Sequence, residues 1–187
     1  MKITEVQTNG TDFFSFFGIH QVAEIPMLGV SVIKKFKPGG FQEAIDIEIT
    51  EDEIGSLLSA AIQIERTWLG NAQHLNPFGT DIAKSFLNTF IDPRDHEQIS
   101  PLVDTIADLH GEFDKIIKIS GKPAGHSPIK GDILHFVMTT LGKEEHWKRQ
   151  YNSCTISFAN ITFKNRTFLE IGVIYPPISP GKQERVY

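Results

Sequence analysis

Acidic side chains crowd one short stretch of the sequence. Six carboxylates and no Lys or Arg lie between residues 43 and 53: Glu43, Asp46, Glu48, Glu51, Asp52 and Glu53. Such a cluster could bind a metal ion, supply a carboxylate pair for acid–base catalysis, or present negative charge to a basic partner. Catalysis requires one carboxyl group to be shielded from water so that its pKa rises. Asp46 and Glu48 alternate with isoleucines, which predicts a solvated strand face and disfavours catalysis.

The histidines and the cysteine offer little for a metal site. Seven histidines are scattered along the chain, and no two have the i, i+4 spacing of zinc ligands on a helix. His110 with Glu112 and Asp114 is the closest cluster, but it is typical of a helix end followed by solvated acids. Cys154 is the one cysteine and lies in an apolar segment, so we expect a structural thiol. The sequence therefore predicts no metal and no cofactor.

The segment 121–131, GKPAGHSPIKG, is the most enzyme-like part of the chain. Its glycines with Lys122 and Lys130 could hold a phosphate, and His126 could transfer a proton. It matches neither the phosphate-loop spacing nor the dinucleotide-binding fingerprint. A connection rich in Gly and Pro needs no function, so a small enzyme built on this loop is an alternative hypothesis.

Length and charge narrow the class of protein. The 187 residues predict one domain, residues 1–178, followed by a mobile tail at 179–187. The first residues show no basic segment followed by an apolar run, so we expect a cytoplasmic protein that does not enter a membrane. Residues 1–114 hold 18 acids against 7 bases, whereas residues 115–187 hold 5 acids against 11 bases. The acidic larger part argues against a nucleic-acid partner.

Two strands are expected to position the acidic stretch. Residues 30–36, VSVIKKF, predict one strand, and residues 37–40, KPGG, predict a turn. Residues 41–49 place isoleucines on one face and Asp46 and Glu48 on the other. The two segments predict a β-hairpin in which lysines stand across from acids and relieve part of their repulsion.

Helices are expected after this hairpin. Residues 50–53, TEDE, fit a capping box and predict a helix that continues to Trp68. A second helix is expected over residues 80–91, with Thr80 as its cap and Asp92-Pro93 as its end.

A third helix is expected to begin at Ser100-Pro101. Asp104 and Asp108 are four residues apart, which places them on one face of this helix, and Glu112 follows it.

The remaining segments complete the predicted fold. The Phe-rich segment 13–17 predicts core packing. In the last third of the chain we expect strands at 113–120, 154–163 and 169–175 and a helix at 132–141. We also expect a polar continuation or loop at 144–149, a bulge near Ala159-Asn160 and a turn at 164–166. Strands, then helices, then strands predict an α+β domain. We expect a mainly antiparallel sheet with about three to four helices packed on one face.

Three functions fit these observations. The first is a non-catalytic protein that binds a basic partner through acidic surface. The second is the small enzyme using loop 121–131. The third is a structural or assembly subunit that uses the Phe-rich N-terminus or a sheet edge of the C-terminal strands.

A family resemblance favours the first function. The chain resembles the bacterial immunity proteins of contact-dependent growth inhibition systems in size, acidity and α+β order. The resemblance includes the region from Phe17 to Ile54, where strands carrying 30-VSVIKKF-36 and 41-FQEAIDIEIT-50 are expected to lead into a helix. It implies a cytoplasmic protein that binds and neutralises a cognate toxin domain, often a basic nuclease. The basic C-terminal third departs from a uniformly acidic inhibitor.

The partner-binding residues follow from the acidic segments on predicted strands and helices. The candidates are Glu43, Asp46, Glu48, Asp104, Asp108 and Glu112, with Asp46 and Glu48 expected to contribute most. We expect a toxin domain as the partner, no nucleic acid and no catalytic residue.

Overall fold

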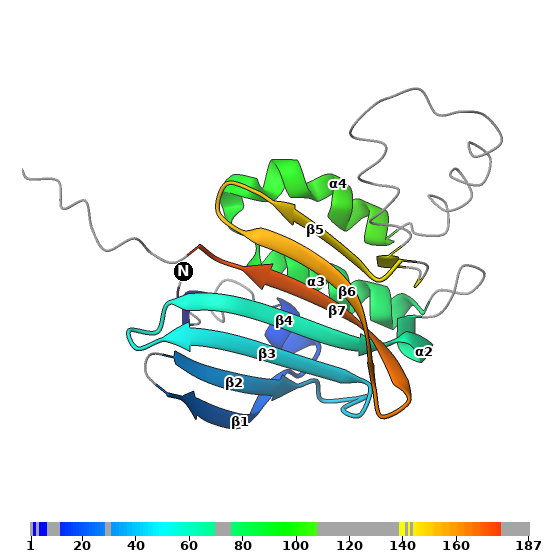
Figure 1. Cartoon of the computed structure of the whole chain (residues 1–187), viewed down its shortest axis with the longest axis horizontal. Coiled ribbons are helices and arrows are strands. Elements are labelled where there is room, and N and C mark those ends of the chain that lie inside the picture. The colour runs from blue at the N-terminus through cyan, green and yellow to red at the C-terminus, as the bar shows by residue number, and fades with distance from the viewer. Residues whose placement is uncertain are drawn as a thin grey trace, which may run out of the picture.

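A seven-stranded antiparallel sheet organises the molecule (Figure 1). The computed structural model describes residues 2, 4–6, 12–28, 31–69, 76–107, 139–140, 142 and 144–176, except for the side chains of residues 12 and 104–107. The strands lie in the order β1-β2-β3-β4-β7-β6-β5. Their bounds are His20–Met27 (β1), Ser31–Lys37 (β2), Ile45–Asp52 (β3), Leu57–Glu65 (β4), His146–Gln150 (β5), Thr155–Phe163 (β6) and Arg166–Ile174 (β7).

The hairpin predicted around the acidic stretch is confirmed. β2 and β3 are antiparallel, with Lys35 opposite Glu48. Ile45, Ile47 and Ile49 on β3 are completely buried, and the residues between them are half-buried. Alternation of apolar and polar residues therefore fixed which side of the strand meets the core.

The helix predicted from residue 50 to Trp68 is wrong, because this stretch continues the sheet. The Asp52 carboxylate accepts hydrogen bonds from the backbone N–H groups of Ile54 and Ser56, at 3.0 and 2.7 Å. Gly55 has a φ of 77°, which a hairpin turn accommodates and a helix interior does not. Asp52 thus closes a turn and does not help to start a helix. Strand β4 follows, and α2 is only the short segment Arg66–Leu69.

Burial explains why β4 is a strand. Ala60, Ile62 and Ile64 are buried while the residues between them are half-buried. Leu58 and Ile62 are four residues apart and also fit a helical spacing, so periodicity alone left two solutions. β-Branched isoleucines and two flanking partners, β3 and β7, favour the sheet.

The described helices begin earlier in the chain than the sequence predicts. Helix α3 (Pro77–Phe90) begins three residues before Thr80 and is capped by Asn76, whose side chain accepts from the Phe78 N–H at 3.1 Å. A 3-10 turn, η2 (Pro93–Asp95), leads directly into α4 (His96–Ala107). Pro101 therefore lies inside α4 and not at its start. The predicted end of α3 before Asp92-Pro93 is confirmed.

Helix α3 and the N-terminal aromatic residues form the core against one face of the sheet (Figure 1). Phe86 and Phe90 of α3 are completely buried. Phe13, in the π-helical turn η1 (Asp12–Phe16), meets both rings edge to face at centroid distances of 5.9 and 6.0 Å. Core packing of the segment 13–17 is confirmed for Phe13 and Phe17, whereas Phe16 is exposed.

The C-terminal strands differ from the prediction in two places. Residues 146–150 are the edge strand β5 and not a loop, because Trp147 is buried beside Phe158. The β6–β7 register runs without a shift from Thr155 to Phe163, so the predicted bulge is absent from this hairpin. The chain reverses at Lys164 and Asn165, whose φ angles of 48° and 64° fit a two-residue hairpin turn. The predicted turn and returning strand are thus confirmed.

The α+β class is confirmed by the sheet and the helices between β4 and β5. The predicted strand 113–120, most of the predicted helix 132–141 and the tail 179–187 lie outside the described residues, so the number of helices stays a prediction. Among the helices that are described, none has both the length and the apolar character needed to cross a bilayer.

Candidate functional site

The acidic strand residues lie on the sheet face opposite α3 and α4. We call this the open face; it carries Lys35, Lys37, Asp46, Glu48, Gln63 and Glu170 from four adjacent strands. In Figure 1 the two helices lie behind the sheet, and the viewer looks onto the open face. Its side chains are only half-buried. Polar groups on rigid strands with access to solvent suit recognition of another molecule.

Each acid of the predicted strand pair has a lysine partner. Lys35 Nζ lies 2.6 Å from Glu48 Oε1, and Lys37 Nζ lies 2.7 Å from Asp46 Oδ1. The side chains of Lys35 and Glu48 are 40 % and 38 % exposed, so water screens this attraction. The hairpin therefore presents an ordered row of alternating charges and little net negative charge.

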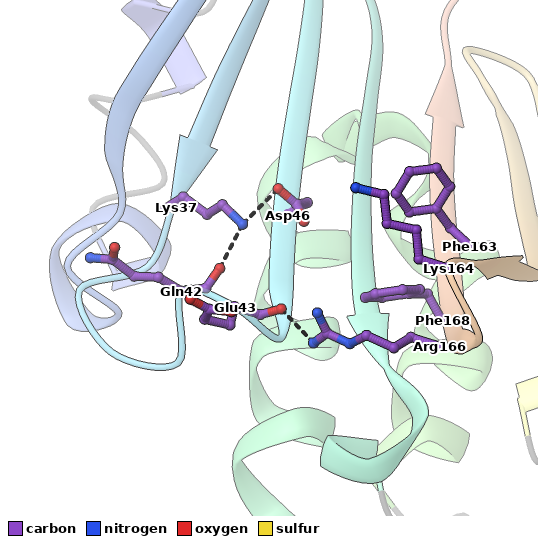
Figure 2. A pocket seen from close by; sticks show the side chains of 8 residues that line it. All are labelled: Lys37, Gln42, Glu43, Asp46, Phe163, Lys164, Arg166 and Phe168. Carbon is purple, nitrogen blue, oxygen red and sulfur yellow. Dashed lines mark hydrogen bonds and ion pairs between the residues drawn. The ribbon is translucent and has the colours of Figure 1, made fainter.

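A pocket of about 410 Å³ lies at one end of the open face (Figure 2). We call it the end pocket; its lining residues are Lys37, Gln42, Glu43, Asp46, Phe163, Lys164, Arg166 and Phe168. The first four come from β2, β3 and the turn between them, and the others come from the β6–β7 hairpin. Figure 2 shows the two groups facing each other across the pocket. The antiparallel topology brings these turns, over a hundred residues apart in sequence, to the same end of the sheet.

Arg166 joins the two sides of the end pocket. Its guanidinium forms a two-point contact with the Glu65 carboxylate, at 3.0 and 2.5 Å, and donates to the Glu43 carbonyl at 2.7 Å. The hydrogen bond from Arg166 lowers the pKa of Glu65, and the same contact raises the pKa of Arg166. The guanidinium carbon also lies 5.3 Å from the centroid of the Phe168 ring. The floor of the pocket is therefore a fixed ion pair over an aromatic ring.

Two exposed aromatic rings flank this end of the sheet. Phe163 is 63 % exposed, and the Lys164 ammonium lies 5.1 Å from its ring centroid. Phe41, next to Gln42, is 46 % exposed and has a φ of 59°. Its ring packs on Trp68 at a centroid distance of 4.2 Å. A positive φ is strained for a bulky residue, so local packing holds this ring at the surface against a backbone cost.

The structure unites some of the predicted partner-binding residues. Glu43 and Asp46 line the end pocket, and Glu48 lies on the same strand face as Asp46. Asp104 lies on α4, but its side chain is outside the described residues. Asp108 and Glu112 are outside them altogether, as are loop 121–131 and His126.

Sequence reasoning missed the other half of the pocket: Phe163, Lys164, Arg166 and Phe168. The signal was present in the parity of Phe163, which falls out of step with the buried Ile156 and Phe158. The bulge hypothesis returned Phe163 to the core. An unbroken register instead puts it on the open face.

Other reactive side chains are placed in structural roles. Burial raises the pKa of the Cys154 thiol to about 11, which fits the predicted structural cysteine. His96 contacts the Ile91 carbonyl at 3.2 Å beside a cavity of about 120 Å³ between α3 and α4. In the part of the chain that the structure describes, no three His, Cys, Asp or Glu side chains are grouped for metal binding.

Comparisons with protein-family models, curated proteins and solved structures gave no match.

Proposed function

We propose that the protein is a non-catalytic binding protein that neutralises a cognate toxin domain, as the immunity proteins of contact-dependent growth inhibition do. The observation that carries the proposal is the position of Asp46 and Glu48 on the open face, next to a pocket lined by the exposed ring of Phe163. The proposed site of action is the cytoplasm, where such a toxin would be met.

A protein partner fits this surface better than a small molecule does. The end pocket opens onto the row of paired charges on β2 and β3. Aromatic residues and arginine are enriched where protein interfaces concentrate their binding energy, and the end pocket offers Phe163 and Arg166. The hairpins that carry them need little rearrangement on binding, which limits the entropic cost of association.

The ion pairs refine the expected role of the acids. Lys35 and Lys37 neutralise Glu48 and Asp46 in the free protein. A basic toxin domain, such as a nuclease, would compete with these lysines for the carboxylates. The acids then contribute to the fit and the choice of partner as well as to the speed of encounter.

The test compares two variants that change the same surface. Asp46→Lys with Glu48→Lys removes both acids and leaves four lysines on neighbouring positions of β2 and β3. We expect it to weaken toxin binding at least tenfold, mainly through slower association. The control exchanges one pair, Lys35→Glu with Glu48→Lys, which keeps an ion pair between opposite positions.

The partner is first isolated by pull-down from the native host on the wild-type protein, then measured against each variant by surface plasmon resonance. Inhibition of the toxin's activity by the wild-type protein is the required companion result. Equal affinity of a folded Asp46→Lys, Glu48→Lys variant contradicts the acidic-strand mechanism. A captured partner whose activity is unaffected contradicts toxin neutralisation.

A further inference from the structure

The charges in the end pocket are unequally satisfied. Among its three cations, Lys37 pairs with Asp46 and Arg166 pairs with Glu65. Within the described residues, no carboxylate forms an ion pair with Lys164. Among the described residues, Lys164 is thus the cation of the pocket that has no carboxylate partner.

The aromatic faces argue against a cationic occupant. Phe163 and Phe168 would suit a lysine or arginine of a partner through cation–π contact. Both rings, however, already have a cation of this chain over them, Lys164 at 5.1 Å and Arg166 at 5.3 Å. On the β6–β7 side of the pocket, an incoming cation would meet the two positive groups that already lie over these rings.

The hairpin turn sets the backbone conformation of Lys164. It occupies the first position of the two-residue turn with a φ of 48°, where Gly, Asn or Asp is strongly preferred. A lysine at this position pays a conformational cost. The turn directs its side chain over Phe163 and along the rim of the pocket (Figure 2).

We infer that the end pocket receives an acidic side chain of a protein partner, whose carboxylate pairs with Lys164 and whose methylene groups cover Phe163. This inference rests on the proposed binding function and adds to it a second contact of opposite charge. The partner that meets acids along β2 and β3 meets a base at the end of the sheet. Opposite charges at two separate points fix the orientation of the complex.

A variant of Glu43 serves as a control, because it should have the opposite effect on binding. Its side chain is exposed at the rim, and its carboxylate has no cation partner among the described ion pairs. It therefore repels an incoming acid. Lys164→Gln should weaken the binding of an acidic probe, whereas Glu43→Gln should strengthen it. Lys148→Gln on the edge strand β5 removes the same charge from an exposed side chain outside the pocket and should change nothing.

The probes are blocked dipeptides titrated into isotope-labelled protein and followed by NMR. N-acetyl-Phe-Glu-amide is compared with the matched Phe-Gln and Phe-Lys amides at low salt. We expect millimolar binding of the Glu probe, weaker binding of the other two by about fivefold, and shifts confined to residues 42–46 and 163–168. Binding should weaken as salt is raised.

Equal or tighter binding of the Phe-Lys probe overturns the inference, as does insensitivity of the Glu probe to Lys164→Gln. These outcomes leave the proposed function standing if a captured toxin still responds to Asp46→Lys with Glu48→Lys. Conversely, selective binding of the Glu probe without any toxin in the pull-down rejects neutralisation and retains a carboxylate-binding pocket.

Discussion

Asp95 shows how a single buried charge is held in this fold. Its side chain is completely buried between the start of α4 and the β5–β6 turn. It accepts hydrogen bonds from Asn152 Nδ2 at 3.1 Å and from the Ser153 N–H at 2.8 Å, and also from the Ser153 hydroxyl. Burial raises the pKa of Asp95, but these hydrogen bonds outweigh it and the pKa is lowered.

We expect Asp95→Asn to reduce the free energy of unfolding by about 2 kcal/mol at pH 7, because the charged acceptor is lost. A lowered pKa means that the contribution of Asp95 is present above its unfolded pKa, about 3.9, and is lost as the pH falls through the folded pKa. Urea unfolding at pH 7 and near pH 3 measures it. The difference between wild type and variant should shrink at the lower pH. A difference that grows on acidification contradicts this account.

Arg66 is a half-buried charge with a structural role. Its guanidinium donates to the carbonyls of Thr139 and Thr140 and to the Asn160 side chain. Burial lowers its pKa to about 10. It joins α2 to the backbone at residues 139–140 and to strand β6.

At the scale of the element, close backbone approach sets where α3 begins. Gly79 lies in the first turn of α3, and a Cβ there would stand 2.4 Å from the Trp68 carbonyl oxygen. We expect Gly79→Ala to destabilise the fold by about 1–3 kcal/mol, because backbone must move. Gly40→Ala is the matched control, since nothing lies within 4 Å of its added Cβ. The melting temperatures of both variants, measured by thermal unfolding, test this prediction. Equal melting temperatures would show that α2 and α3 are not in rigid contact.

The strands also show which parts of the fold could be predicted from the sequence. The β2–β3 hairpin was accessible because Ile45, Ile47 and Ile49 alternate with charge over one uninterrupted strand. β4 was not, because its apolar residues satisfy two periods and the decision depends on β7, over a hundred residues later. The local acidic pattern predicted two of the eight residues that line the end pocket, Glu43 and Asp46. The β6–β7 side depended on the register of β6, for which the parity of Phe163 was a signal but a bulge was a competing solution.

At the scale of the molecule, the edge strand β1 differs from the open face. β1 exposes most of its side chains, including Val22 and Met27. It also has a register shift near Val22, and a proline, Pro26, lies within the strand. Both features interrupt the template that an added strand would need. The β1 edge is therefore a poor template for strand addition.

The measurement to make first is hydrogen exchange of the protein alone and bound to the captured toxin. If the open face and its end pocket are the binding surface, exchange should slow in the turns at residues 38–44 and 163–166, while α3 and β1 keep their free rates. Protection confined to β1 or to the helices, with both turns unchanged, would contradict the proposed surface.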